Sequence, residues 1–174
     1  METVGLGFHF EDLPVGRRFR TIGRTVTEAD ITNFVNCTGM VEVLFTNTEF
    51  LREKSDIKQR LAPAALSYCF AEGLLVQATM QHTGLAFLHM EFNVEKPVFA
   101  GDTIHVECEV IEARLSRNRP GRGLVRTQSG DEAGRRGGAD LHAAADDQVP
   151  GGVIVTPPPL SLRVHTGRRS ARPG

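Results

Sequence analysis

The stretch of residues 64–80 most constrains what this chain can fold into. Its apolar residues are too many and too evenly spread for a surface helix, which has one solvent-exposed face. They are Leu66, Cys69, Phe70, Leu74, Val76 and Met80. Pro63 suits a first helical turn, because its backbone angle is fixed and its missing N–H is not needed there. The sequence therefore predicts a central helix that is buried on most sides.

The segment before this helix predicts a strand and two shorter helices. Residues 19–26 have strand character, and Thr27 follows as an N-cap with Asp30 at the reciprocal position of a capping box. The helix that begins there runs to about Cys37, where Gly39 can adopt the left-handed conformation that closes it. Residues 48–54 predict one or two further helical turns.

The segment after the central helix predicts consecutive strands over residues 86–94 and 103–113, with another beginning at residues 123–127. Within 103–113, the apolar side chains Val106, Cys108 and Val110 alternate with polar ones, which is the period of a half-buried antiparallel strand. Helices followed by consecutive strands predict an α+β fold, with an antiparallel sheet packed against the central helix.

Composition narrows the class of protein. A chain of 174 residues with a net charge of −1 is about one domain, and it has no overall charge that would attract nucleic acid or an anionic membrane surface. No run of residues is long and apolar enough for a membrane span, and the N-terminus lacks the pattern of a signal peptide. The three cysteines are too far apart for a disulfide framework or a zinc site. We therefore expect a cytoplasmic protein without a metal or another cofactor.

Four segments in order carry a resemblance to a known family. They are FEDLPVGRRF, VTEADITNFVNCTG, RLAPAALSYCFAEGLL and KPVFAGDTIHVECEVIEAR. Over about residues 8–127 the chain resembles MaoC-like hotdog proteins, which include the (R)-specific enoyl-CoA hydratases. The resemblance implies a hotdog fold in which a sheet wraps the central helix. It also implies a homodimer, or a heterodimer with another hotdog subunit, and an acyl-CoA thioester bound near the subunit boundary.

The catalytic motif of that family is not retained. The family pattern Gly-Asp-x-Asn-Pro-x-His falls on residues 39–45, where Gly39 matches but Met40 replaces the aspartate and Phe45 replaces the histidine. Glu42 and Val43 occupy the asparagine and proline positions. Met and Phe cannot exchange protons, so the acid and base that hydration requires are absent from these positions.

Other positions of the resemblance imply a site that binds a thioester. Pro63 and Ala64 occupy the place of the family's His-Gly pair at the helix start, and N–H groups there, of Ala64 above all, can polarise a carbonyl. The expected binding residues are Met40, Phe45, Asn47, Pro63, Ala64 and Ala65. Asn47 can orient a ligand or, alternatively, cap the helix that begins near residue 48.

Two carboxylates remain as catalytic candidates. Glu42 can serve as a general base if burial raises its pKa, or it is a solvated or capping group. Glu72, in the middle of the central helix, matches the carboxylate that some hotdog thioesterases use, or it is an exposed residue or an ion-pair partner. His105 has no spacing typical of metal ligands, and the arginines between residues 114 and 126 either meet CoA phosphates or form a solvated basic loop.

The last 47 residues have a different composition. From Gln128 onward Phe, Tyr, Trp, Lys and Met are absent and Gly, Ala, Arg and Pro dominate, so a disordered tail is expected over residues 128–174 after a hotdog domain over 1–127. Residues 130–148, GDEAGRRGGADLHAAADDQ, can be back-translated so that a shift of one base gives VTKQDGEVVLTYTPLRMIK. This peptide has a turn and a β-prone segment where the fold needs its final strands. We therefore infer a frame slip just after Thr127, either genuine or a sequencing error.

Three functions follow from these residues. The first is an acyl-CoA hydratase or dehydratase that uses Glu42 and the Ala64 N–H. The second is a non-catalytic hotdog subunit that binds an acyl thioester, and the third is a thioesterase that uses Glu72. The family resemblance favours the first function as the name of the protein. The residues at the motif positions favour the second function as its mechanism. Neither nucleic acid nor a membrane is expected as a partner.

Overall fold

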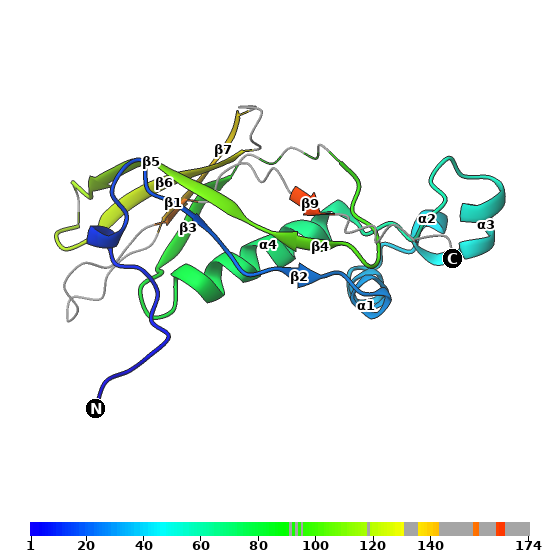
Figure 1. Ribbon diagram of the computed structural model, residues 1–174, viewed down its shortest axis with the longest axis horizontal. Coiled ribbons are helices and arrows are strands. Elements are labelled where there is room, and N and C mark those ends of the chain that lie inside the picture. The colour runs from blue at the N-terminus through cyan, green and yellow to red at the C-terminus, as the bar shows by residue number, and fades with distance from the viewer. Residues whose placement is uncertain are drawn as a thin grey trace, which may run out of the picture.

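The computed structural model describes residues 1–90, 92, 94, 96–117, 119–130, 136–142, 155–156 and 163–165. Its centre is helix α4 (Ala64–Thr79), and two sheets lie along one side of that helix (Figure 1). The larger sheet has the antiparallel order β1 (Arg18–Arg20), β5 (Glu107–Leu115), β6 (Gly123–Gly130), β7 (Arg136–His142) and β3 (Ala86–Met90), with β8 (Val155–Thr156) parallel to β6. The smaller has β2 (Arg24–Thr25), β4 (Thr103–His105) and β9 (Arg163–His165). The predicted α+β architecture is confirmed.

The helices begin and end where local chemistry requires. A short 3-10 helix, η1 (Phe10–Asp12), precedes β1, and α1 (Glu28–Thr38), α2 (Val43–Thr46) and α3 (Thr48–Glu53) follow β2. Thr27 caps α1 by accepting a hydrogen bond from the Asp30 N–H, while Asp30 accepts one from the Thr27 N–H. Gly39 ends α1 with a φ of +72°, a conformation that costs glycine little. The capping box and the left-handed glycine are both confirmed.

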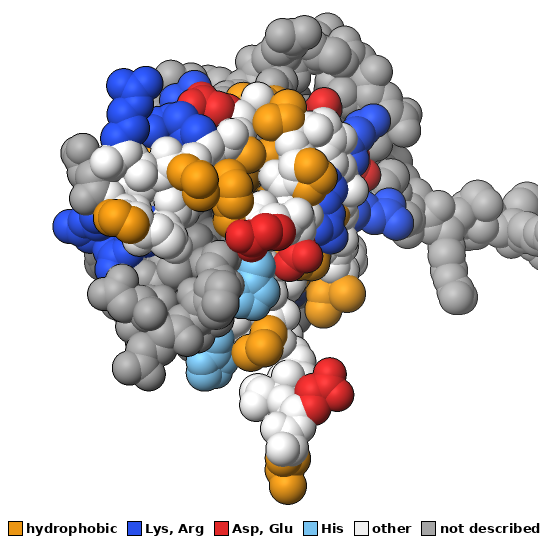
Figure 2. Space-filling model, turned by 90° about the vertical axis from the view of Figure 1, so that its left-hand side faces the viewer, with side chains coloured by type: hydrophobic (Ala, Val, Ile, Leu, Met, Phe, Trp, Pro, Cys, Tyr) orange, Lys and Arg blue, Asp and Glu red, His pale blue; other side chains and the backbone are white. Residues whose placement is uncertain are grey.

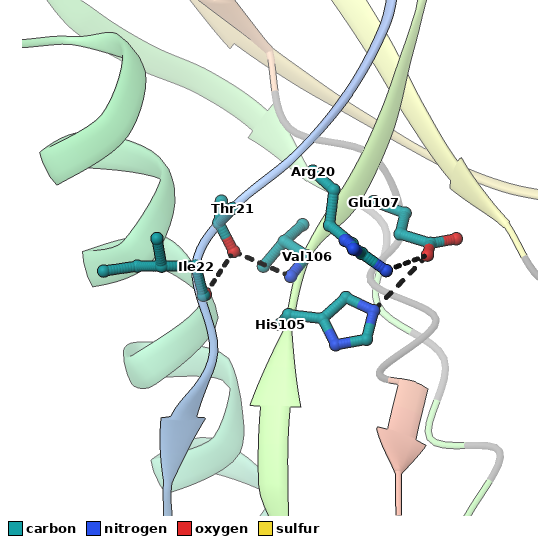
Figure 3. A network of polar contacts seen from close by, with 6 residues as sticks. All are labelled: Arg20, Thr21, Ile22, His105, Val106 and Glu107. Carbon is teal, nitrogen blue, oxygen red and sulfur yellow. Dashed lines mark hydrogen bonds and ion pairs between the residues drawn. The ribbon is translucent and has the colours of Figure 1, made fainter.

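The long strands predicted over residues 19–26 and 103–113 are each interrupted. Residues 21–23 separate β1 from β2, and Val106 separates β4 from β5. Figure 3 shows the reason: the Thr21 hydroxyl accepts a hydrogen bond from the Val106 N–H at 3.0 Å and donates one to the Ile22 carbonyl at 3.0 Å. The Thr21 side chain thus replaces a backbone acceptor for the Val106 N–H. On either side of this point the same two segments pair in different sheets, β1 with β5 in the larger and β2 with β4 in the smaller.

Close to this break lies a charged cluster. The His105 ring nitrogen Nε2 is 3.3 Å from a Glu107 carboxylate oxygen, and the Arg20 guanidinium lies 3.9 Å from the same oxygen (Figure 3). The side chain of His105 is only 9% exposed. The prediction that His105 lies on a strand is confirmed, because it is the last residue of β4.

The main hydrophobic core joins α1, α4 and the strands. It includes Ile31 and Val35 of α1, Leu66 and Leu75 of α4, and a group at the break between the sheets, namely Ile104, Val106 and Cys108. The prediction that the central helix is buried on most sides is wrong for the single chain. Ala65, Cys69, Gly73 and Val76 are exposed, because the sheets cover only one side of α4.

The C-terminal third differs in part from the expectation. The predicted boundary after Thr127 falls inside β6, and β7 pairs with both β6 and β3 within the segment expected to lack strands. The remaining residues of the predicted disordered tail, 131–135, 143–154, 157–162 and 166–174, lie outside the described part of the chain. None of the helices in the described ranges is both long and apolar enough to cross a bilayer.

Candidate binding site

A pocket of about 400 Å³ opens beside the first turn of α4. Its walls come from α2, from the segment that leads into α4, from α4 itself and from the segment between β3 and β4. The lining residues are Phe45, Ile57, Leu61, Ala62, Pro63, Ala64, Ser67, Phe92, Val94, Lys96, Pro97 and Val98. The volume is in the range of small-molecule sites, and all but two of these side chains are apolar. The pocket therefore suits a ligand with an apolar body.

Backbone hydrogen bonds hold two of the walls together. The Ala62 N–H donates to the Val98 carbonyl at 2.8 Å, and the Ala100 N–H donates to the Arg60 carbonyl at 3.0 Å. Between these bonds Leu61 and Phe99 form an isolated antiparallel bridge. The segments before α4 and before β4 thus run as a short paired ribbon along the pocket.

The N-terminus of α4 faces this space. Pro63 is the N-cap residue, and no side chain caps the helix. The N–H of Ala64 has no acceptor within the helix, as for any first-turn residue, and the helix dipole adds a partial positive charge there. An acceptor oxygen on a ligand can be bound at this end of the helix.

Ser67 is one of the two polar side chains that line the pocket, the other being Lys96. The residue is 4% exposed, and its hydroxyl has no hydrogen-bond partner among the described residues. The sequence analysis did not select Ser67. A signal was present, since Ser67 lies three residues after Ala64 and residues at this spacing share a helix face.

Two carboxylates that were catalytic candidates lie elsewhere. Glu42 is exposed and caps α2, where its carboxylate accepts a hydrogen bond from the Leu44 N–H at 2.7 Å. Glu72 is half-buried on α4 beside Tyr68, and burial together with the hydrogen bond to Glu72 raises the pKa of Tyr68 well above its ordinary value. Neither glutamate is among the residues that line the pocket.

The predicted cluster of arginines lies at the other end of the molecule. Arg114 and Arg126 both pair with Glu112 at 3.1 Å, on the β5–β6 hairpin, whereas the pocket lies at the N-terminal end of α4 (Figure 1). Figure 2 views the hairpin end and shows Lys and Arg side chains with acidic side chains among them. A solvated basic surface, the alternative left open by the sequence, describes these arginines better than a site for CoA phosphates.

A family model described as a MaoC like domain matches residues 11–131. This chain belongs to the MaoC-like family. No curated protein matches the chain.

Solved structures support the hotdog fold of this MaoC-like chain. A MaoC-like dehydratase from Rhodospirillum rubrum has 25% identity and a TM-score of 0.63, covering 80% of this chain and 99% of that one. An unliganded R-hydratase from Pseudomonas aeruginosa has 20% identity and a TM-score of 0.62, covering 80% and 88%. A Mycobacterium tuberculosis protein with a double hotdog fold has 22% identity and a TM-score of 0.63, covering 88% and 48%. The predicted hotdog fold is confirmed.

The binding residues expected from the resemblance to MaoC-like proteins divide into two groups. Phe45, Pro63 and Ala64 line the pocket. Met40, Asn47 and Ala65 are not among the lining residues and are exposed: Met40 is 37% exposed, and the Asn47 side chain accepts a hydrogen bond from the Phe50 N–H at 2.9 Å as the cap of α3. The capping alternative for Asn47 is therefore confirmed.

Proposed function

We propose that this MaoC-like protein binds an acyl thioester, such as an acyl-CoA, in the pocket at the start of α4 and does not hydrate it. One observation carries the proposal. The lining combines apolar walls with the uncapped end of a helix, and Lys96 is its one ionisable side chain among the described residues. Apolar walls suit an acyl chain, and the helix end suits the carbonyl oxygen.

The chemistry of hydration supports a binding function over turnover. Adding water across an enoyl thioester needs a base for the water and an acid for the α-carbon. Phe45 stands in the pocket at the position of the family histidine, and a phenyl ring can do neither. Glu42 is held by its capping bond to the Leu44 N–H.

A second hotdog subunit is part of the proposal. The exposed apolar residues of α4, such as Val76 at 39% exposure, form a surface that a partner can cover. The Mycobacterium tuberculosis neighbour carries two hotdog units in one chain. We propose that this chain pairs with a copy of itself or with an active hotdog subunit and contributes binding to that assembly.

The first test separates binding from catalysis. We expect calorimetry to detect binding of hexanoyl-CoA and crotonyl-CoA, while absorbance shows no loss of the crotonyl double bond and a thiol reagent detects no free CoA. Hydration that disappears in Glu42→Gln would show that this carboxylate is a base. Thiol release that disappears in Glu72→Gln would establish the thioesterase instead.

A second prediction concerns charge at the pocket. Lys96 is exposed and lines the pocket, so its ammonium can attract the phosphates of CoA. We expect Lys96→Gln to weaken hexanoyl-CoA binding about two- to fivefold at low salt, as for an exposed ion pair, and the difference to vanish in about 1 M salt. Lys54→Gln is the matched control, because Lys54 is exposed and does not line the pocket. Equal losses in both variants at low salt would contradict a local role for Lys96.

A further inference from the structure

We propose that the Ser67 hydroxyl donates a hydrogen bond to the carbonyl oxygen of the bound thioester, beside the N–H of Ala64. This inference rests on the proposed function and names the part of the ligand that the pocket recognises. It makes Ser67 a binding residue for an acyl carbonyl, at a position that the family motif does not mark.

The first observation is the unsatisfied hydroxyl. Serine and threonine inside a helix commonly donate to the carbonyl four residues before them. In this chain the helical residues Thr38, Thr46 and Thr79 all do so, with distances between 2.7 and 2.9 Å. Ser67 also lies within a helix and is only 4% exposed. Its hydroxyl nevertheless makes no such bond in the described part of the chain.

The second observation is the direction of the side chain. Ala64 and Ser67 are three residues apart on α4, so they share one face, and both line the pocket. Side chains on a helix lean toward its N-terminus, which brings the Ser67 hydroxyl back toward the first turn. The hydroxyl and the Ala64 N–H can therefore converge on one acceptor atom.

The surrounding chemistry selects the ligand group. A buried hydroxyl without a partner is unfavourable, and the apolar side chains around this pocket offer it no acceptor. A thioester carbonyl brings one oxygen that can accept from both donors, whereas the acyl chain beyond it suits the apolar walls. The two donors together distinguish a thioester from a ligand of the same length without the carbonyl.

The test compares two ligands and three proteins. Hexanoyl-CoA has the carbonyl, and S-hexyl-CoA, a thioether, has a methylene group in its place. We expect the unmodified protein to bind the thioester about 10- to 100-fold more tightly than the thioether, because each of the two neutral hydrogen bonds contributes about three- to tenfold. Ser67→Ala should lower this preference by about three- to tenfold, with the Ala64 N–H keeping the remainder, and should leave the thioether affinity within about twofold. Thr79→Val is the control, because it removes another buried hydroxyl of the same helix, bonded to the Leu75 carbonyl.

The possible outcomes distinguish a failure of the Ser67 proposal from a failure of the proposed thioester binding. Binding of neither ligand by the unmodified protein would overturn the proposed function. Binding of both, with the same preference before and after Ser67→Ala, would overturn the role of Ser67 alone. A melting temperature that falls further in ligand-free Ser67→Ala than in Thr79→Val would also overturn it, since the hydroxyl would then have a structural bond within the protein.

Discussion

An Ala64→Phe variant is expected to lose hexanoyl-CoA binding by about 100-fold or more, because an added ring at this position fills the pocket that the acyl group must enter. Ala64 is the first residue of α4 and is exposed, so the ring has room to enter the pocket without displacing the buried core. The loss should appear with both crotonyl-CoA and hexanoyl-CoA.

Ala65→Phe is the matched control for this variant. Ala65 is the next residue of the same helix and is also exposed, but it does not line the pocket. The intrinsic helix cost of phenylalanine, about 0.5 kcal/mol, is common to both variants. Calorimetry on the two proteins, together with melting temperatures, gives the comparison. Equal affinities in the two variants would mean that the ligand binds elsewhere.

Replacing residues 130–148 with the shifted-frame peptide VTKQDGEVVLTYTPLRMIK is expected to raise the free energy of unfolding by about 3 kcal/mol. We propose that a frame slip after Thr127 replaced the last strands of the fold. Strand β7 lies between β6 and β3, and in the given sequence it includes Gly137, Gly138 and Asp140. These residues are depleted in strands because glycine gains no packing and aspartate prefers turns.

The register of the shifted peptide supports this proposal. When its first residue is placed at position 130, the segment EVVLTYT falls on 136–142, which are the bounds of β7, and the turn-forming KQDG falls on 132–135, between β6 and β7. The shifted peptide thus places β-branched and aromatic residues at β7, an interior strand of the sheet, where this chain has a glycine-rich segment.

Urea unfolding of the two chains measures this difference, and the slope of the transition reports the buried surface. Resequencing the gene across codons 120–155 is an independent check. In the shifted frame a GTG or GTA codon for Val153, followed by the first base of the Ile154 codon, reads as a stop. An unbroken frame without that stop would contradict the frame slip, as would equal stability of the two chains.

Local patterns were sufficient for most of the helices. The central helix predicted over residues 64–80 is observed at Ala64–Thr79, and Thr27 and Gly39 bound α1 as expected. These features depend on neighbours within four residues, so the sequence alone can indicate them. The four-residue α2 is too short to show a helical periodicity, so the sequence does not predict it.

Non-local contacts decided what the sequence could not predict. The alternation of residues 103–113 continues through Val106, but the hydroxyl of Thr21, 85 residues earlier, takes its N–H and divides the strand. The pocket likewise combines residues from separate segments, and Phe92 reaches it while packing on Tyr68 with ring centroids 5.9 Å apart. No spacing within one segment marks Phe92 or Lys96 as a lining residue of the pocket.

The paired ribbon beside the pocket has a thermodynamic consequence. Because the Ala62 N–H to Val98 carbonyl and Ala100 N–H to Arg60 carbonyl bonds form within the protein, two walls are already ordered before any ligand arrives. Ordering a loop on binding offsets part of the affinity, and a preorganised wall avoids that entropic loss. Ligand contacts at these two walls therefore translate into affinity with little conformational penalty, which is consistent with the proposed binding of a thioester.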